Sequence, residues 1–211
     1  MKKIYLLALI LLFTLLMNGQ TTTHAKPQDS CISQSEVEFE NSFRRLWIDH
    51  VLWTSNYITS ATTADAGDQK QVLTRLLKNQ EDIGNAIKPV YGEQAGNQLT
   101  GLLKEHIVIA GKIVDAAKRN DTASVNKLNK EWYKNADEIA AFLSSSNPNL
   151  KNEELKELLY MHLKLVTDDV IASVQNNWSN RITSIDEGVS HIILMSDAIS
   201  SGVVKQFPDK F

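Results

Sequence analysis

The motif LWIDHV occupies residues 46–51, and related hexapeptides follow it at a constant spacing. A shift of 56 residues aligns it with LLKEHI at 102–107, and a second equal shift reaches LLYMHL at 158–163. The same shift aligns KNQEDI at 78–83 with KNADEI at 134–139 without a gap. Repetition at a fixed period indicates copies of one supersecondary unit. The sequence therefore predicts a helical hairpin that occurs three times.

Helical periodicity extends through nearly all of the chain beyond its N-terminal region, and no strand-like alternation interrupts it. Clusters of Pro, Gly, Asn, Asp, Ser and Thr divide it into six predicted helices, at 35–59, 68–88, 96–117, 123–143, 152–175 and 180–206. Pro89 and Pro148 should end the second and fourth helices, because proline cannot continue a helical hydrogen-bond ladder. We expect an all-α, up-and-down helical bundle with a four-helix-bundle-like core, forming a single domain over 35–211.

The end of the third unit aligns in two ways. Without a gap His191 matches Asn79, whereas a slip of three residues matches Asp197 with Asp82.

The N-terminus has the features of a secretory signal peptide. Lys2 and Lys3 precede the apolar run 4–17, and a small-residue cleavage site ends at Ala25. We expect residues 1–25 to be removed, leaving a protein that is secreted or associated with the cell envelope.

The composition of the remaining chain limits its partners. Loss of the two lysines takes the formal net charge from −3 to −5, and no basic run is present, which argues against nucleic acid and anionic membrane. No other stretch is long and apolar enough for stable membrane insertion. The single cysteine, Cys31, lies in a segment expected to be disordered, 26–34, and is either inert or pairs with another chain. A protein partner or a homo-oligomer is compatible with these features.

Three histidines occupy equivalent positions in the three units, namely His50, His106 and His162. At 100° per residue, the apolar neighbours of His106 all fall within about 60° of it, so the ring lies near the centre of the apolar stripe. Short connections make successive helices alternate in direction, so the three histidine-bearing helices should run parallel. We expect the three imidazoles to meet in the core at a similar depth.

Inward-facing histidines at one depth suggest a transition-metal site, because neutral imidazole is the commonest protein ligand for Zn, Cu and Fe. His191 is a candidate fourth ligand, and Asp49 and Glu105 could bind the metal or orient a neighbouring ring. A haem held by two of the rings is a further interpretation, although no attachment motif is present. In the alternative, the rings are core histidines satisfied by Thr, Asp, Tyr or water and inherited together by duplication.

The second helices of the first two hairpins each carry an acidic residue and an asparagine at equivalent positions, and the two residue types receive different interpretations. Asp82 and Glu138 project about 100–140° away from the apolar stripe and are expected to be solvated. Asn79 and Asn135 lie nearer the stripe, where their amides could bridge helices by hydrogen bonds.

These patterns give a leading function and two others. The first is metal binding or sensing outside the cytoplasm. The second is a metal-free interaction module at the cell surface or in the envelope, which a large exposed apolar patch would favour. The third is a hydrolytic metalloenzyme, for which Glu105 would be the general base. No Glu-x-x-His, His-Glu-x-x-His, phosphate-loop or nucleophile-elbow motif occurs, so the sequence specifies no enzymatic activity.

Four stretches resemble a family of small exported bacterial helical proteins of unknown function, some of which carry the label "glycosyltransferase". They are LWIDHVLWT at 46–54, NQEDIGNAI at 79–87, NADEIAAFL at 135–143 and KQFPDKF at 205–211. The resemblance covers essentially the whole mature chain and implies the fold and export, with no established activity. Members of the family often have Arg after the Thr of the first motif, where this chain has Ser55. A nucleotide-sugar glycosyltransferase would need a nucleotide-binding α/β domain, and no predicted strands supply one.

Overall fold

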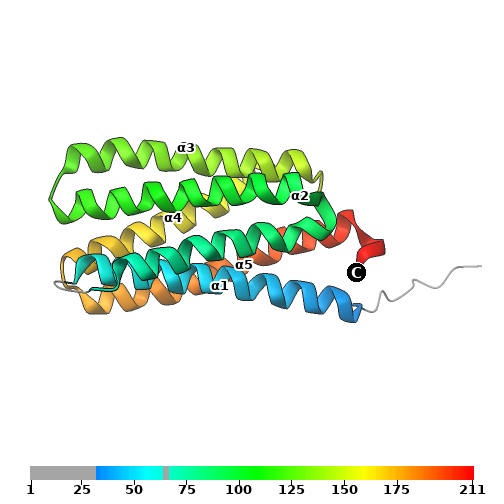
Figure 1. Ribbon diagram of the computed structural model, residues 1–211, viewed down its shortest axis with the longest axis horizontal. Coiled ribbons are helices and arrows are strands. Elements are labelled where there is room, and N and C mark those ends of the chain that lie inside the picture. The colour runs from blue at the N-terminus through cyan, green and yellow to red at the C-terminus, as the bar shows by residue number, and fades with distance from the viewer. Residues whose placement is uncertain (1–31, 64–66) are drawn as a thin grey trace, which may run out of the picture. The chain divides into compact units, whose positions relative to one another are not determined.

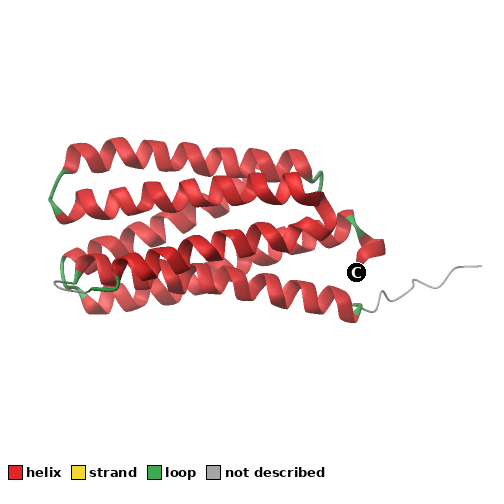
Figure 2. Cartoon of the chain, viewed as in Figure 1, coloured by secondary structure: helices red, strands yellow, loops and turns green. Residues whose placement is uncertain are grey.

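The computed structural model describes residues 32–63 and 67–211, and α-helices account for almost all of this part of the chain (Figure 1, Figure 2). The described residues contain no β-strand, so the prediction of an all-α bundle is confirmed. None of the described helices has both the length and the apolar character needed to cross a membrane. The elements are α1 (Gln34–Thr62), α2 (Gln69–Lys118), α3 (Thr122–Ser146), α4 (Asn152–Val174), α5 (Trp178–Gln206) and the 3-10 helix η1 (Pro208–Lys210). The predicted signal peptide, 1–25, and Cys31 lie outside the described residues.

Local side-chain chemistry explains several of the helix ends. Ser33, Asp121 and Asn177 each accept a hydrogen bond from the backbone N–H three residues later, at 3.0, 3.0 and 3.2 Å, which caps α1, α3 and α5. Asn120 and Asn176 follow the ends of α2 and α4 with φ of 55° and 56°. Asparagine tolerates this left-handed conformation better than most residues, so each one ends its helix with a sharp turn.

The expected six helices are not matched exactly, because the predicted segments 68–88 and 96–117 both belong to α2. Pro89 lies inside α2 and does not end it. The break comes three residues later, where Gly92 has φ 85° and ψ 169°. The chain reverses there, and the two halves of α2 run antiparallel (Figure 1). Proline costs little here because it removes one hydrogen bond in the last turn before a reversal.

The two halves of α2 approach each other closely at two glycines. A Cβ on Gly84 would lie 2.5 Å from the backbone oxygen of Gly96, and a Cβ on Gly96 would lie 2.6 Å from that of Gly84. Farther from the turn, Lys104 Nζ donates to Glu81 Oε1 at 2.6 Å. Backbone contact near the turn and an ion pair beyond it hold the two halves of α2 together.

All five helices contribute to one core. Residues Ile32–Phe211 form a compact unit in which α1 packs against α2 and α5, α3 against α2, and α4 against α3 and α5. In Figure 1, α3 lies beside the second half of α2 while α4 crosses behind. The core includes one fully buried side chain from each helix: Phe43, Ile83, Ile139, Leu163 and Ile192.

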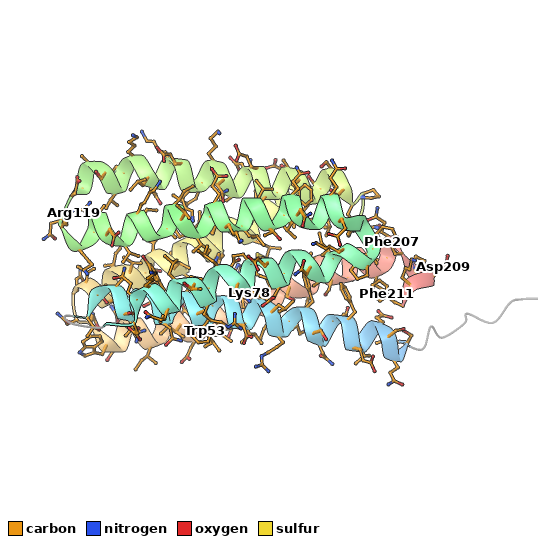
Figure 3. The ribbon with its side chains drawn as sticks, viewed as in Figure 1. Trp53, Lys78, Arg119, Phe207, Asp209 and Phe211 are labelled. Atoms are coloured by element: carbon orange, nitrogen blue, oxygen red, sulfur yellow. The ribbon has the colours of Figure 1, made fainter. Side chains whose placement is uncertain are left out.

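The C-terminal residues close one end of the bundle. The Phe211 ring lies 4.8 Å from that of Phe39 on α1, and the Phe207 ring lies 5.0 Å from that of Tyr91 on α2. Figure 3 shows Phe207 and Phe211 at the end of the bundle opposite Arg119. Aromatic contacts therefore attach the last residues to both α1 and the α2 reversal.

Replacement of the turn glycine tests whether backbone strain controls the α2 reversal. Gly92→Ala should destabilise the protein by about 1–3 kcal/mol, because its φ and ψ belong to a region that is nearly exclusive to glycine. A Cβ would meet no atom within 4 Å at this position, so a steric clash would not contribute. The measurement is urea denaturation. Gly101→Ala on the same helix also meets nothing within 4 Å, and as the control it should stabilise by about 0.5–1 kcal/mol. Equal changes in the free energy of unfolding for the two variants would contradict a role for backbone strain at Gly92.

Candidate functional site: three buried histidines

The structure brings together His50 of α1, His106 of the second half of α2, and His162 of α4. Their exposed fractions are 2%, 4% and 3%. The His162 ring centre lies 5.3 Å from that of His50 and 6.2 Å from that of His106. The 56-residue spacing thus places three imidazoles in one part of the core, with His162 adjacent to both of the others.

A side-chain amide determines which nitrogen of His50 carries the proton. His50 Nδ1 lies 3.2 Å from Gln80 Oε1. The Gln80 amide nitrogen donates to Leu76 O at 2.9 Å and to Asn79 Oδ1 at 3.1 Å, which identifies Oε1 as the acceptor. His50 therefore donates from Nδ1, and in the neutral ring the lone pair is on Nε2.

The same arrangement is present around His106. Its Nδ1 lies 2.8 Å from Asn135 Oδ1, and Asn135 Nδ2 donates to the backbone oxygen of Leu102 at 3.2 Å. Asn135 Oδ1 is therefore the acceptor, and His106 also presents its lone pair on Nε2. A metal-binding histidine almost always donates its other ring N–H to an oxygen acceptor, and here the acceptor is a side-chain amide oxygen.

Burial keeps all three rings neutral. It lowers the pKa of His50 to about 3 and that of His106 to about 4, and the charge of His106 further lowers the His50 pKa. Burial also lowers the pKa of His162 well below 6.5, with additional contributions from the other histidines. Hydrogen bonds donated by the rings to side-chain amide oxygens partly oppose the pKa shifts of His50 and His106, whereas no hydrogen bond is among the causes of the His162 shift. At neutral pH the cluster therefore consists of uncharged imidazoles.

Three helix-bridging hydrogen bonds recur at the 56-residue shift, and each joins residues 33 apart in the sequence. Asn79 donates to Leu46 O at 2.9 Å, Asn135 to Leu102 O at 3.2 Å, and His191 Nε2 contacts Leu158 O at 2.8 Å. This agrees with the gapless alignment of His191 with Asn79. Because a carbonyl oxygen only accepts, His191 donates from Nε2, and only its Nδ1 would be available as the predicted fourth metal ligand.

Asp49 and Glu105, the predicted carboxylate partners, lie elsewhere. Asp49 pairs with Arg45 at 3.0 Å and with Arg75 at 3.7 Å. Glu105 is exposed and lines a surface groove with Lys134. Each precedes its histidine by one residue, which turns its side chain about 100° away around the helix.

The other carboxylates singled out from the sequence are also at the surface. Asp82 pairs with Lys78 at 2.7 Å, and Glu138 pairs with Lys134 at 2.8 Å. Both are solvated ion pairs within one helix, as their distance from the apolar stripe predicted.

The three rings are neighbours, but they are not arranged around a common point. Among residues 32–63 and 67–211, no group of three or more His, Cys, Asp or Glu side chains is placed so that it could hold a metal ion. With Zn–N distances of about 2.0–2.1 Å, imidazoles on one tetrahedral ion have centres roughly 5 Å apart. The 5.3 Å separation fits that value, and the 6.2 Å separation exceeds it by roughly 1 Å. Coordination by all three would therefore require a small inward movement of His106 or His162.

Sequence reasoning missed a buried ion pair beside His162. Asp169 of α4 lies 3.3 Å from Arg181 of α5, and Arg181 also donates to Ser55 Oγ at 2.9 Å on α1. Asp169 is 5% exposed, and burial raises its pKa while Arg181 opposes the shift. Asp169 and His162 line the same small hollow. The sequence did contain an indication of this pair. Asp169 follows His162 by seven residues, and seven residues return a helix to nearly the same face.

Gln80 was also missed as the partner of His50. The aligned position in the second hairpin is Ala136, so the repeat offered no indication of its role. The side-chain amide of Asn79 donates to Leu46 O and accepts from Gln80 Nε2. Gln80 therefore supplies the acceptor for His50 that Asn135 supplies for His106.

Comparisons with known protein families, with curated proteins and with solved structures found no match for this chain. The resemblance to exported helical proteins stays a prediction.

The buried histidines should make the protein acid-sensitive. Below pH 6.5 the unfolded chain takes up protons on these rings, while the folded protein keeps them neutral to about pH 4 at His106 and about pH 3 at His50. The free energy of unfolding should therefore decrease as the pH decreases through this window. The decrease should be up to about 1.4 kcal/mol per pH unit for each ring. Denaturation at pH 5.5 and 4.5 measures the slope. His162→Leu should reduce it by about 1.4 kcal/mol per pH unit, and an unchanged slope would contradict the pKa assignment.

Proposed function

We propose that this protein binds a transition-metal ion through Nε2 of His50, His106 and His162. The observation that carries the proposal is the tautomer of two of the rings. Gln80 and Asn135 accept from Nδ1 of His50 and His106, so each ring keeps its Nε2 lone pair available. His162 lies against both rings, and no other described residue forms such a hydrogen bond with it, so its orientation is the least constrained.

The electrostatics of the cluster favour the same function. A metal competes with protons for imidazole, and here burial has already removed that competition at neutral pH. Three neutral nitrogens with an open fourth position suit Zn or Cu best, and Fe less well because no carboxylate joins them. The ligand set we propose is therefore the three core histidines, without His191, Asp49 or Glu105.

We further infer that the three hairpins are copies of one unit and that the protein acts outside the cytoplasm. The three hydrogen bonds that span 33 residues each support the first inference. The charge and hydropathy pattern of residues 1–25 supports the second.

A metal-free interaction module is the second candidate function. Exposed apolar side chains on α4 and α5 favour it. Met161 and Leu194 are 46% and 62% exposed and line one surface groove together with Leu165. Such a groove is typical of a contact surface for another protein.

Metal content and thermal stability distinguish the two functions. Protein purified without a metal-affinity tag should retain about one Zn or Cu ion per chain, measured by elemental analysis. At a metal concentration of about one hundred times Kd, the bound ion should stabilise the fold by about 2.7 kcal/mol and raise Tm by about 5–10 °C. A chelator should abolish this increase.

Two variants test the ligand assignment. The double variant His50→Leu/His162→Leu should lose metal binding, whereas Glu105→Gln, the surface control, should bind as the unmodified protein does. Metal-free protein with a chelator-insensitive Tm, and no binding on titration with Zn, would refute the metal function and favour the interaction module.

The amide that orients His50 should affect metal affinity without touching the metal. Gln80→Leu should weaken Zn binding by about 10–100-fold, because His50 would lose the acceptor that fixes its tautomer. Gln98→Leu, at an exposed position of the same α2, is the matched control and should have no effect. Isothermal titration calorimetry measures both. Equal affinities would show that Gln80 does not orient a metal ligand.

A further inference from the structure

An apolar cavity of about 100 Å³ lies between α1, α2, α3 and α4. Its lining includes Tyr57, Ile107, Val114, Trp132 and Val170, and nearly all of its surface is carbon. Cavities of this kind stay dry and accept apolar guests, and an engineered cavity of roughly 150 Å³ in another protein binds benzene. At about two thirds of that volume, the space here limits a guest to one small ring.

Two of the lining residues carry buried polar atoms without a partner. The indole N–H of Trp132 and the hydroxyl of Thr54 have no hydrogen bond among the described residues. Trp132 is 2% exposed and Thr54 is 7% exposed. An unsatisfied buried donor is costly, so an acceptor supplied from outside the chain would gain the interaction that the fold leaves unmade.

The wall of the cavity includes one solvent-exposed side chain and another side chain that adjoins the histidines. Ile171 lines it and is 49% exposed, so one part of the wall reaches solvent at α4. On the inner side the Trp132 ring lies 5.1 Å from the His106 ring, and Thr54 follows His50 by one helical turn. The cavity is therefore the apolar neighbour of the histidine cluster, separated from it by the indole.

We propose that this cavity binds a small single-ring aromatic molecule carrying one hydrogen-bond acceptor, of which an aryl ketone is the simplest example. The ring occupies the apolar space, and the acceptor takes the free N–H of Trp132. This site does not depend on a metal at the histidines.

A pair of probes with matched shapes tests the apolar and polar parts separately. Acetophenone and α-methylstyrene differ by a carbonyl oxygen in place of a methylene carbon. Both should bind, and acetophenone should bind about fivefold more tightly, the effect of one net hydrogen bond. Calorimetry gives the affinities. The indole N–H resonance of Trp132 should shift with acetophenone, and its assignment comes from the Trp132→Phe spectrum.

Variants assign the binding to this cavity. Trp132→Phe should make the two probes bind equally, because it keeps an aromatic ring and removes the donor. Ala110→Leu places extra carbon in the lining and should abolish binding of both probes, whereas Ala123→Leu, exposed on α3, is the control and should leave binding unchanged. If Ala110→Leu does not fold, nuclear Overhauser effects from the acetophenone methyl group to Ile107 and Val170 locate the ligand in the unmodified protein.

Absence of saturable binding of either probe would overturn the proposal, as would binding that survives in folded Ala110→Leu. Equal affinities of the two probes for the unmodified protein would overturn the assignment of Trp132 as the donor.

Discussion

A buried imidazole must find partners for its ring nitrogens, and much of the polar interior of this bundle serves that requirement. Gln80 and Asn135 each use the oxygen of their amide for a histidine and the nitrogen for a carbonyl or a second amide. These contacts join α1 to the first half of α2 and the second half of α2 to α3. The polar groups that satisfy the rings therefore also fix the register between helices, which apolar packing alone specifies less sharply.

The three core histidines would each carry a positive charge if protonated, and all three are neutral in the folded protein at neutral pH. Burial keeps the rings neutral, and the neighbouring histidines lower the pKa values of His50 and His162 further. The buried carboxylate of Asp169 is paired with Arg181, and Asp169 lines the same small hollow as His162. Arg181 also contacts α1, so this pair ties α1, α4 and α5 together near the cluster.

The cavity and the histidine cluster share the residues between them. Trp132 contacts His106 and lines the apolar space, and Thr54 lies one turn from His50. Close packing around the rings and looser packing beyond the indole therefore occur within one continuous interior. A ligand in the cavity would contact Trp132, whose other neighbour is His106. The two proposed sites are therefore adjacent, although neither requires the other.

Helical periodicity and the 56-residue spacing by themselves determined the all-α class, the positions of most turns and the inward direction of His50, His106 and His162, because these follow from helix geometry. Asn79 and Asn135 as helix bridges were predictable for the same reason. Only the tertiary structure decided that Gln80 holds His50, that His191 binds a carbonyl, and that Arg181 meets Asp169. Those outcomes depend on which helices become neighbours and at what rotation. The α2 reversal lies in the break predicted between 68–88 and 96–117, and the structure decided that it occurs at Gly92 and not at Pro89.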